Sequence, residues 1–214
     1  MITLQGLERV SLLSVWMLNP NLGEFLAILR NKGYITAKVK PRSGGGYDIA
    51  FLEPPNVIAI KGSTYLMYDP GRRSLMVDGA TPDEMLLAFN EVENLLREVG
   101  SDPDKCVLFY EFLAKASAVA NKLYLGPLET SDILGFNVIM LPITIVSENG
   151  DPNSTNWFHM DIRPMWTSWK DNKIRYEITL IYRNEKSILI KFAKTLENNL
   201  KKLLDRISIF LSRH

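Results

Sequence analysis

The chain has 214 residues, and 25 lysine and arginine residues against 24 aspartate and glutamate residues give it a formal net charge of +1. A hydrophobic fraction of 46%, with 13 glycines and 11 prolines, is ordinary for a globular protein and excludes a disordered, collagen-like or disulfide-scaffold chain. The balanced charge disfavours nonspecific nucleic-acid binding, which depends on many contacts between basic side chains and phosphates.

The cysteine content and the apolar runs indicate the compartment. Cys106 is the single cysteine, which excludes an intrachain disulfide and a cysteine-rich zinc site. The apolar runs at residues 12–18 and 139–146 are far shorter than the roughly 20 residues that cross a bilayer, and no basic segment followed by a cleavage site precedes them. We therefore expect a soluble, cytoplasmic protein without a membrane segment.

The single glutamine, Gln5, also fits the avoidance of labile residues in a thermophile.

The first half of the chain predicts a strand, a helix, a meander of short strands and a second helix. Residues 7–17 alternate with apolar side chains on both faces, which is typical of a strand covered on both sides. Asn19-Pro20 predicts a helix start, and Thr81 with Glu84 predicts a capping box that opens a longer helix up to Gly100. Between the helices, alternating patterns and turn residues predict strands at residues 35–40, 47–53, 57–62, 65–68 and 75–77.

The second half repeats this order with different residues. Apolar residues at three- and four-residue steps between Phe109 and Leu123 predict a helix capped by residues 101–104, with a strand at residues 107–112 as the alternative. Residues 136–146 are apolar on both faces and predict a central strand, followed by a polar loop at residues 147–155. Further strands are expected at residues 157–163, 174–183 and 187–192, and a final amphipathic helix at residues 195–211.

This order predicts an α+β fold in which antiparallel meander sheets are each followed by a long packed helix. The halves, residues 1–100 and 101–214, suggest an internal duplication and form either two units or one continuous domain. In architecture the order resembles the half-repeat of TATA-box-binding-protein-like folds. It also resembles helix-grip domains, in which a curved sheet wraps a C-terminal helix around a ligand cavity. These resemblances imply a shape and no function.

The most unusual composition lies between residues 156 and 170, which hold three of the four tryptophans. Period-two alternation predicts that Phe158, Met160 and Ile162 point inward, and that Arg175, Glu177, Thr179 and Arg183 on the next strand point outward. The outward face is then either a solvated sheet face with cross-strand ion pairs or a recognition surface, because aromatic rings and arginine carry binding energy at interfaces and stack on bases. The candidate binding residues are Trp157, His159, Asp161, Arg163, Trp166, Trp169, Lys170, Arg175 and Glu177.

A catalytic function receives less support from the sequence than a binding function does. His159, Asp161 and Glu177 on one face offer a general base with an orienting carboxylate, but a protein metal site needs three or four ligands and the second histidine, His214, is terminal. The glycine run at residues 44–46 continues into a strand rather than a helix, which favours a hairpin over a phosphate loop. We expect no metal and no cofactor.

The leading hypothesis is a non-catalytic binding or scaffold protein that acts through protein–protein contacts or self-association. A nucleic-acid-binding protein using the Trp/Arg-rich sheet face is the first alternative. The second is a small-ligand-binding or hydrolytic helix-grip domain with a pocket lined by Phe136, Met140 and Tyr176.

Overall fold

The computed structural model describes residues 2–43, 46–121, 143–148, 150–165 and 173–211. The fold is α+β: one large antiparallel sheet carries most of the strands, and five helices lie within the described residues. The strands are β1 Thr3–Trp16, β2 Ile35–Thr36, β3 Lys38–Pro41, β4 Tyr47–Ala50, β5 Val57–Lys61, β6 Thr64–Asp69, β7 Ser74–Gly79, β8 Val107–Asn121, β9 Ile143–Val146, β10 Trp157–Pro164 and β11 Lys173–Asn184. The helices are α1 Leu22–Asn31, α2 Pro82–Glu98, α3 Pro103–Cys106, α4 Lys186–Lys194 and α5 Leu196–Leu211.

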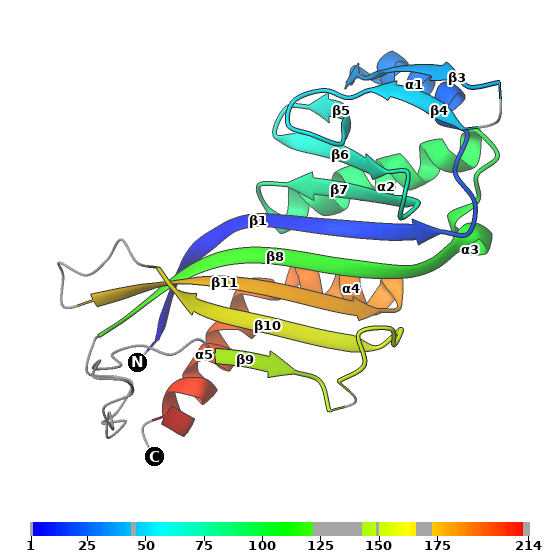
Figure 1. Ribbon diagram of the computed structural model, residues 1–214. Coiled ribbons are helices and arrows are strands. Elements are labelled where there is room, and N and C mark those ends of the chain that lie inside the picture. Colours follow the sequence, from blue (N-terminus) through cyan, green and yellow to red (C-terminus); the bar gives the residue numbers. More distant parts are fainter. Residues whose placement is uncertain (1, 44–45, 122–142, 149, 166–172, 212–214) are drawn as a thin grey trace, which may run out of the picture.

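Nine strands form the main sheet in the order β2-β5-β6-β7-β1-β8-β11-β10-β9, while β3 and β4 form a separate hairpin. The two longest strands, β1 and β8, pair at its centre from Thr3–Val119 to Trp16–Val107 (Figure 1). The first half of the chain therefore supplies the strands on one side of this pair and the second half supplies those on the other. A single sheet joins both halves.

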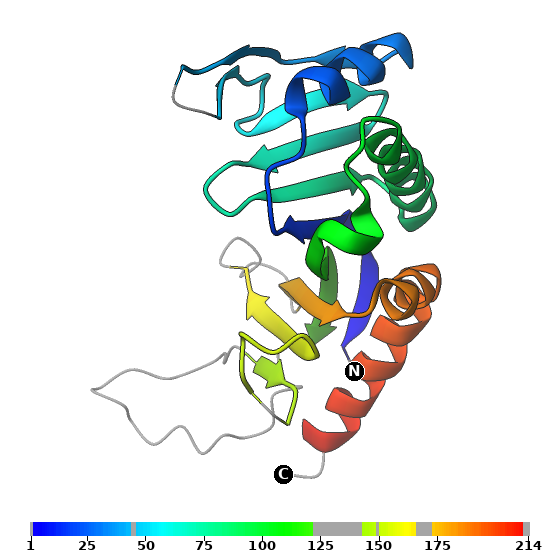
Figure 2. The same cartoon turned by 90° about the vertical axis from the view of Figure 1, so that its right-hand side faces the viewer.

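Helices α2, α4 and α5 lie on the same face of the sheet (Figure 2). Helix α2 packs on β1, β6 and β7, α4 packs on β8 and β11, and α5 reaches back to β1. The backbone N–H of Ile2 donates to Ser208 Oγ of α5 at 2.9 Å, which ties the start of the chain to its last helix.

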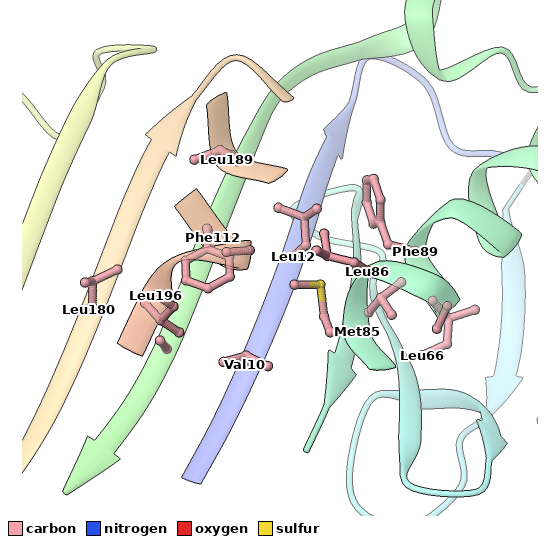
Figure 3. Packing of buried hydrophobic residues seen from close by; sticks show 14 of the residues in the cluster. Val10, Leu12, Leu66, Met85, Leu86, Phe89, Phe112, Leu180, Leu189 and Leu196 are labelled. Atoms are coloured by element: carbon pink, nitrogen blue, oxygen red, sulfur yellow. The ribbon is translucent and has the colours of Figure 1, made fainter. Parts of the chain in front are cut away.

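The core lies between the sheet and these helices. Val10 and Leu12 of β1 and Phe112 of β8 face Met85 of α2 and Leu196 of α5 (Figure 3), and all five residues are at most 1% exposed. At Gly79, the end of β7, an added Cβ would lie 2.9 Å from the backbone nitrogen of Met85, so this position admits only glycine without a shift of α2. The sheet and α2 thus approach each other directly.

Local sequence signals account for some of the element boundaries. Thr81 caps α2, because its hydroxyl accepts a hydrogen bond from the Glu84 N–H at 3.3 Å, as the capping pattern predicts. The predicted strands at residues 7–17, 157–163 and 174–183 are confirmed as β1, β10 and β11, and the predicted last helix is confirmed as α5. Helix α1 begins after Asn21 rather than at Asn19-Pro20. The strand expected at residues 35–40 is divided at Ala37, whose N–H bonds to the Ile58 carbonyl.

Three element predictions are wrong. The segment from Phe109 is strand β8, preceded by the one-turn helix α3, because buried residues recur at every second position rather than at helical spacing. Residues 187–192 belong to helix α4, in which Leu189 and Ala193, four residues apart, are buried. The described part of the expected central strand at residues 136–146 is β9, which is the last strand in the order of the described sheet rather than a central one, while residues 136–142 lie outside the described residues.

None of the described helices is both long enough and apolar enough to span a membrane. This agrees with the short apolar runs of the sequence.

Candidate functional site

The face of the sheet opposite α2, α4 and α5, here called the open face, carries no helix over its central strands among the described residues (Figure 2). Strand register arranges its side chains in rows that cross the sheet. One row runs Met67, Met76, Leu13, Glu111, Arg183 and Trp157. The next runs Tyr65, Asp78, Ser11, Leu113, Ile181, His159 and Val146, and a third runs Arg9, Lys115, Thr179, Asp161 and Thr144.

The predicted pleat of β10 is confirmed. Met160 and Ile162 are fully buried on the helix face, while Phe158 packs edge-to-face on Tyr182 at 5.8 Å between ring centroids. Trp157, His159, Asp161 and Arg163 therefore lie on the open face. On β11, Ile174, Tyr176, Ile178 and Leu180 are buried on the helix side, as predicted.

The other predicted binding residues divide into two groups. Arg175 and Glu177 lie on the open face of β11, where Arg175 is exposed and Glu177 stands opposite Arg163 in the strand register. Trp166, Trp169 and Lys170 lie outside the described residues, as do Phe136 and Met140 of the predicted ligand pocket. Tyr176, the third residue of that pocket, is 1% exposed in the core.

Arg183 faces outward as predicted, yet it is buried rather than solvated, with a relative exposure of 8%. Its guanidinium lies 4.2 Å from the Phe109 ring centroid and 5.7 Å from that of Trp157. Its Nη2 donates to Glu111 Oε2 at 2.6 Å, and its Nη1 donates to the Pro152 and Ser154 carbonyls. The polar loop before β10 thus folds onto the open face and is held there by an arginine between two aromatic rings.

His159 and Asp161 meet as the sequence predicts. His159 Nε2 lies 3.2 Å from Asp161 Oδ1, and the His159 ring stacks on Trp157 with centroids 5.5 Å apart. Asp161 also accepts from Thr144 Oγ1 at 2.6 Å and from Arg163 Nη2 at 2.7 Å. The hydrogen bond from Thr144 lowers the pKa of Asp161 most, and those from His159 and Arg163 add to it against the opposing effect of burial.

This cluster is already paired within itself. Glu177, the third member of the predicted acid–base group, stands opposite Arg163, two positions along β10 from Asp161 and four from His159. Asp161 lies beside the His159 ring as an orienting carboxylate would, and its two oxygens also accept hydrogen bonds from Thr144 and Arg163. The arrangement orders the end of β10 and links it to Thr144 of β9.

Replacing Asp161 with asparagine should destabilise the protein at neutral pH by about 1.5–3 kcal/mol, the range for a hydrogen bond to a charged group. The lowered pKa means that the carboxylate contributes its stabilisation above its ordinary value of 3.8 and loses it as the pH falls through the folded-state pKa. Urea unfolding at several pH values should therefore show the difference between wild type and Asp161→Asn shrinking below pH 3.8. A difference that stays constant to low pH contradicts this account.

Most charges on the open face are paired. Arg9 bonds to Asp78, which Ser11 Oγ also reaches at 2.7 Å; Arg163 bonds to Asp161 and Arg183 to Glu111. Lys115 is an exposed cation for which the described residues provide no ion pair. The face therefore offers few free positive charges to a polyanion.

Between these ion pairs lies an apolar area on four adjacent strands, here called the central patch: Leu13, Val15, Met76, Leu113 and Ile181. Leu13 is buried by its neighbours, and the other four are partly exposed. Sequence reasoning missed this patch as a site. The signal was present, because β1 is apolar on both faces, but it was interpreted as a strand covered on both sides.

A second polar cluster lies on the helix side, where the halves meet. Lys186 at the start of α4 donates to Glu93 of α2 at 3.1 Å and to Asp104 at 3.3 Å, and Tyr110 donates to Glu93 at 3.0 Å. Burial, with the negative charge of Glu93, raises the pKa of Tyr110. A pocket of about 450 Å³ adjoins Lys186 and Tyr110. Each charged group of this cluster has a partner within it, so the cluster links α2, α3 and α4.

Among the described residues no three histidine, cysteine or acidic side chains come together as a metal site. A scan against protein-family models found no match to this chain, and searches of curated proteins and of solved structures found none either. The candidate function therefore rests on the geometry of the chain itself.

Proposed function

We propose that this chain is a non-catalytic binding protein that docks a protein partner on the open face, with the central patch as the anchor. One observation carries the proposal: a large antiparallel sheet is covered by helices on one face and presents partly exposed apolar side chains at the centre of the other. Interfaces combine an apolar centre with a polar rim, and methionine adapts its shape to different surfaces. The ion pairs of Arg9 and Arg163 would form that rim.

The charge distribution favours a protein over a nucleic acid as the partner. A phosphate backbone is bound by unpaired lysine and arginine side chains, whereas Arg9, Arg163 and Arg183 are each held by a carboxylate of the same face. Aromatic rings that stack on bases must also present a free ring face, and the Trp157 ring is flanked by Arg183 and His159.

The test uses Leu113→Lys in the central patch and Leu18→Lys, at a side chain that is 74% exposed elsewhere, as the matched control. Both variants and wild type are immobilised after circular dichroism confirms folding, and their companions from an extract of the native cells are quantified by mass spectrometry. We expect a companion that wild type and Leu18→Lys retain and that Leu113→Lys loses by about tenfold or more, with direct binding reproduced by the purified companion.

Two outcomes contradict the proposal. Equal recovery by wild type and Leu113→Lys removes the central patch as the contact. A gel shift with DNA or RNA at low salt that Leu113→Lys abolishes, without any protein companion, assigns the open face to nucleic acid instead.

We also propose that the two halves are related by duplication, in the manner of the TATA-box-binding-protein-like arrangement. The strand order outward from β1 is β1-β7-β6-β5, and the order outward from β8 is β8-β11-β10-β9. In each half the first strand pairs with the last strand before a helix. The helix-grip alternative receives less support, because Leu200 and Leu204 of α5 are packed at 1% exposure.

A further inference from the structure

We propose that the layer formed by α2 and α4 is a self-association surface, on which α2 of one copy lies against α4 of a second copy about a two-fold axis. The proposal concerns the face opposite the central patch and does not depend on the partner of the open face.

Helices α2 and α4 carry opposite charge. Helix α2 has five carboxylates and one arginine, whereas α4 has three lysines and no acidic residue. Part of this charge is used inside the molecule, since Glu93 binds Lys186 and Glu91 binds Lys61. The exposed side chains of Asp83, Glu98, Lys191 and Lys194 make no ion pair with the described residues. They remain free for a second molecule.

The two helices lie side by side and run in opposite directions. Lys186, at the start of α4, reaches Glu93 in the second half of α2. The end of α4 and the start of α2 meet at a pocket of about 470 Å³ lined by Lys194, Thr195, Pro82 and Asp83. Figure 2 shows both helices protruding from the same side of the sheet. Their outer surfaces therefore form one layer that is acidic on one side and basic on the other.

A two-fold axis parallel to the seam between the helices fits this layer to itself. Rotation about that axis places α2 of the second copy over α4 of the first and, at the same time, α4 of the second over α2 of the first. Positions along the seam are kept, so Asp83 of one copy comes opposite Lys194 of the other. Each of the two contacts joins the acidic helix of one copy to the basic helix of the other, so both are attractive. A single symmetry operation produces both contacts, whereas an unrelated partner would need a basic and an acidic surface of its own.

Each half of the surface also offers an apolar side chain. Leu87, in the second turn of α2 and four residues after Asp83, is 77% exposed, and Ile188 of α4 is 41% exposed. A leucine exposed to this extent on an otherwise charged helix is the kind of residue that an interface buries at its centre.

The test is sedimentation of the full chain over micromolar to submillimolar concentration. We expect a concentration-dependent dimer whose dissociation constant rises with salt, because the contacts between the charged side chains are screened. Leu87→Lys should weaken the dimer by about tenfold or more, whereas the control Leu18→Lys should not change it.

A mixing experiment identifies the pair of surfaces. The variant Asp83→Lys/Glu98→Lys removes the acidic excess of α2 and sets lysines against the lysines of α4, and the variant Lys191→Glu/Lys194→Glu makes both helices acidic, so each should sediment as a monomer at low salt. Their equimolar mixture should form a heterodimer, because both contacts between unlike copies are attractive again. A wild-type monomer at all concentrations, a dimer unaffected by Leu87→Lys, or a mixture that stays monomeric overturns the proposal.

Discussion

Replacing Glu111 with alanine should lower the free energy of unfolding by about 3–5 kcal/mol, the cost of breaking a buried ion pair by removing one partner. Glu111 and Arg183 form such a pair at 2.6 Å, with side-chain exposures of 9% and 10%. After the substitution, the guanidinium stays between Phe109 and Trp157 without its carboxylate. Its remaining acceptors are the carbonyls of Pro152 and Ser154, which are neutral.

Urea unfolding measures this effect. The control is Glu177→Ala, at a glutamate that also lies on the open face but on β11, and its free energy of unfolding should change by no more than about 0.5 kcal/mol. The double variant Glu111→Leu/Arg183→Met should be more stable than Glu111→Ala, because it removes both charges rather than leaving one buried. A double variant as unstable as the single one would mean that Arg183 acts through packing and its carbonyl contacts rather than through the ion pair.

The order of the strands along the chain was predictable wherever one face of a strand is buried and the other is polar. Residues 174–183 alternate cleanly, so their period alone gives strand β11 and its buried face. Strand β8 has apolar residues on both faces, with Phe112 inside and Leu113 on the open face, and this pattern has no clear period. A short apolar run such as that of α4 has the same ambiguity, which only packing against β8 and β11 resolves.

The sequence alone predicts which side chains of the candidate site share one face of the sheet, but it does not predict which of them are exposed to solvent. Successive side chains of a strand point to opposite faces, so every second residue of β10 lies on the same face: Trp157, His159, Asp161 and Arg163. The burial of Arg183 depends on Pro152 and Ser154, which are about 30 residues away and fold back over it. The central patch combines strands from both halves, so its extent depends on the pairing of β1 with β8, which no local pattern contains.

Removing the ring of Phe112 should destabilise the protein by about 3–5 kcal/mol, the range for deleting a buried aromatic side chain. Phe112 is fully buried at the centre of β8, between Leu12 of β1 and Tyr182 of β11 in the strand register. Its ring packs edge-to-face on Phe192 of α4 at 5.6 Å, and Phe192 packs in the same way on Tyr182 at 5.1 Å. Phe112→Ala therefore leaves a cavity where the two halves and α4 meet.

The measurement is urea unfolding of Phe112→Ala and Phe112→Leu beside Phe51→Ala, whose side chain is at the surface with 36% exposure. Phe112→Leu should lose less stability than Phe112→Ala because it fills part of the cavity, and Phe51→Ala should lose about 1 kcal/mol or less. Since β1 and β8 belong to one sheet, both halves should unfold in a single transition. The substitution should lower the urea concentration at the midpoint of that transition and should not add a second transition. A Phe112→Ala variant that unfolds in two separate steps would contradict a shared core, and would show that residues 1–100 and 101–214 fold as independent units.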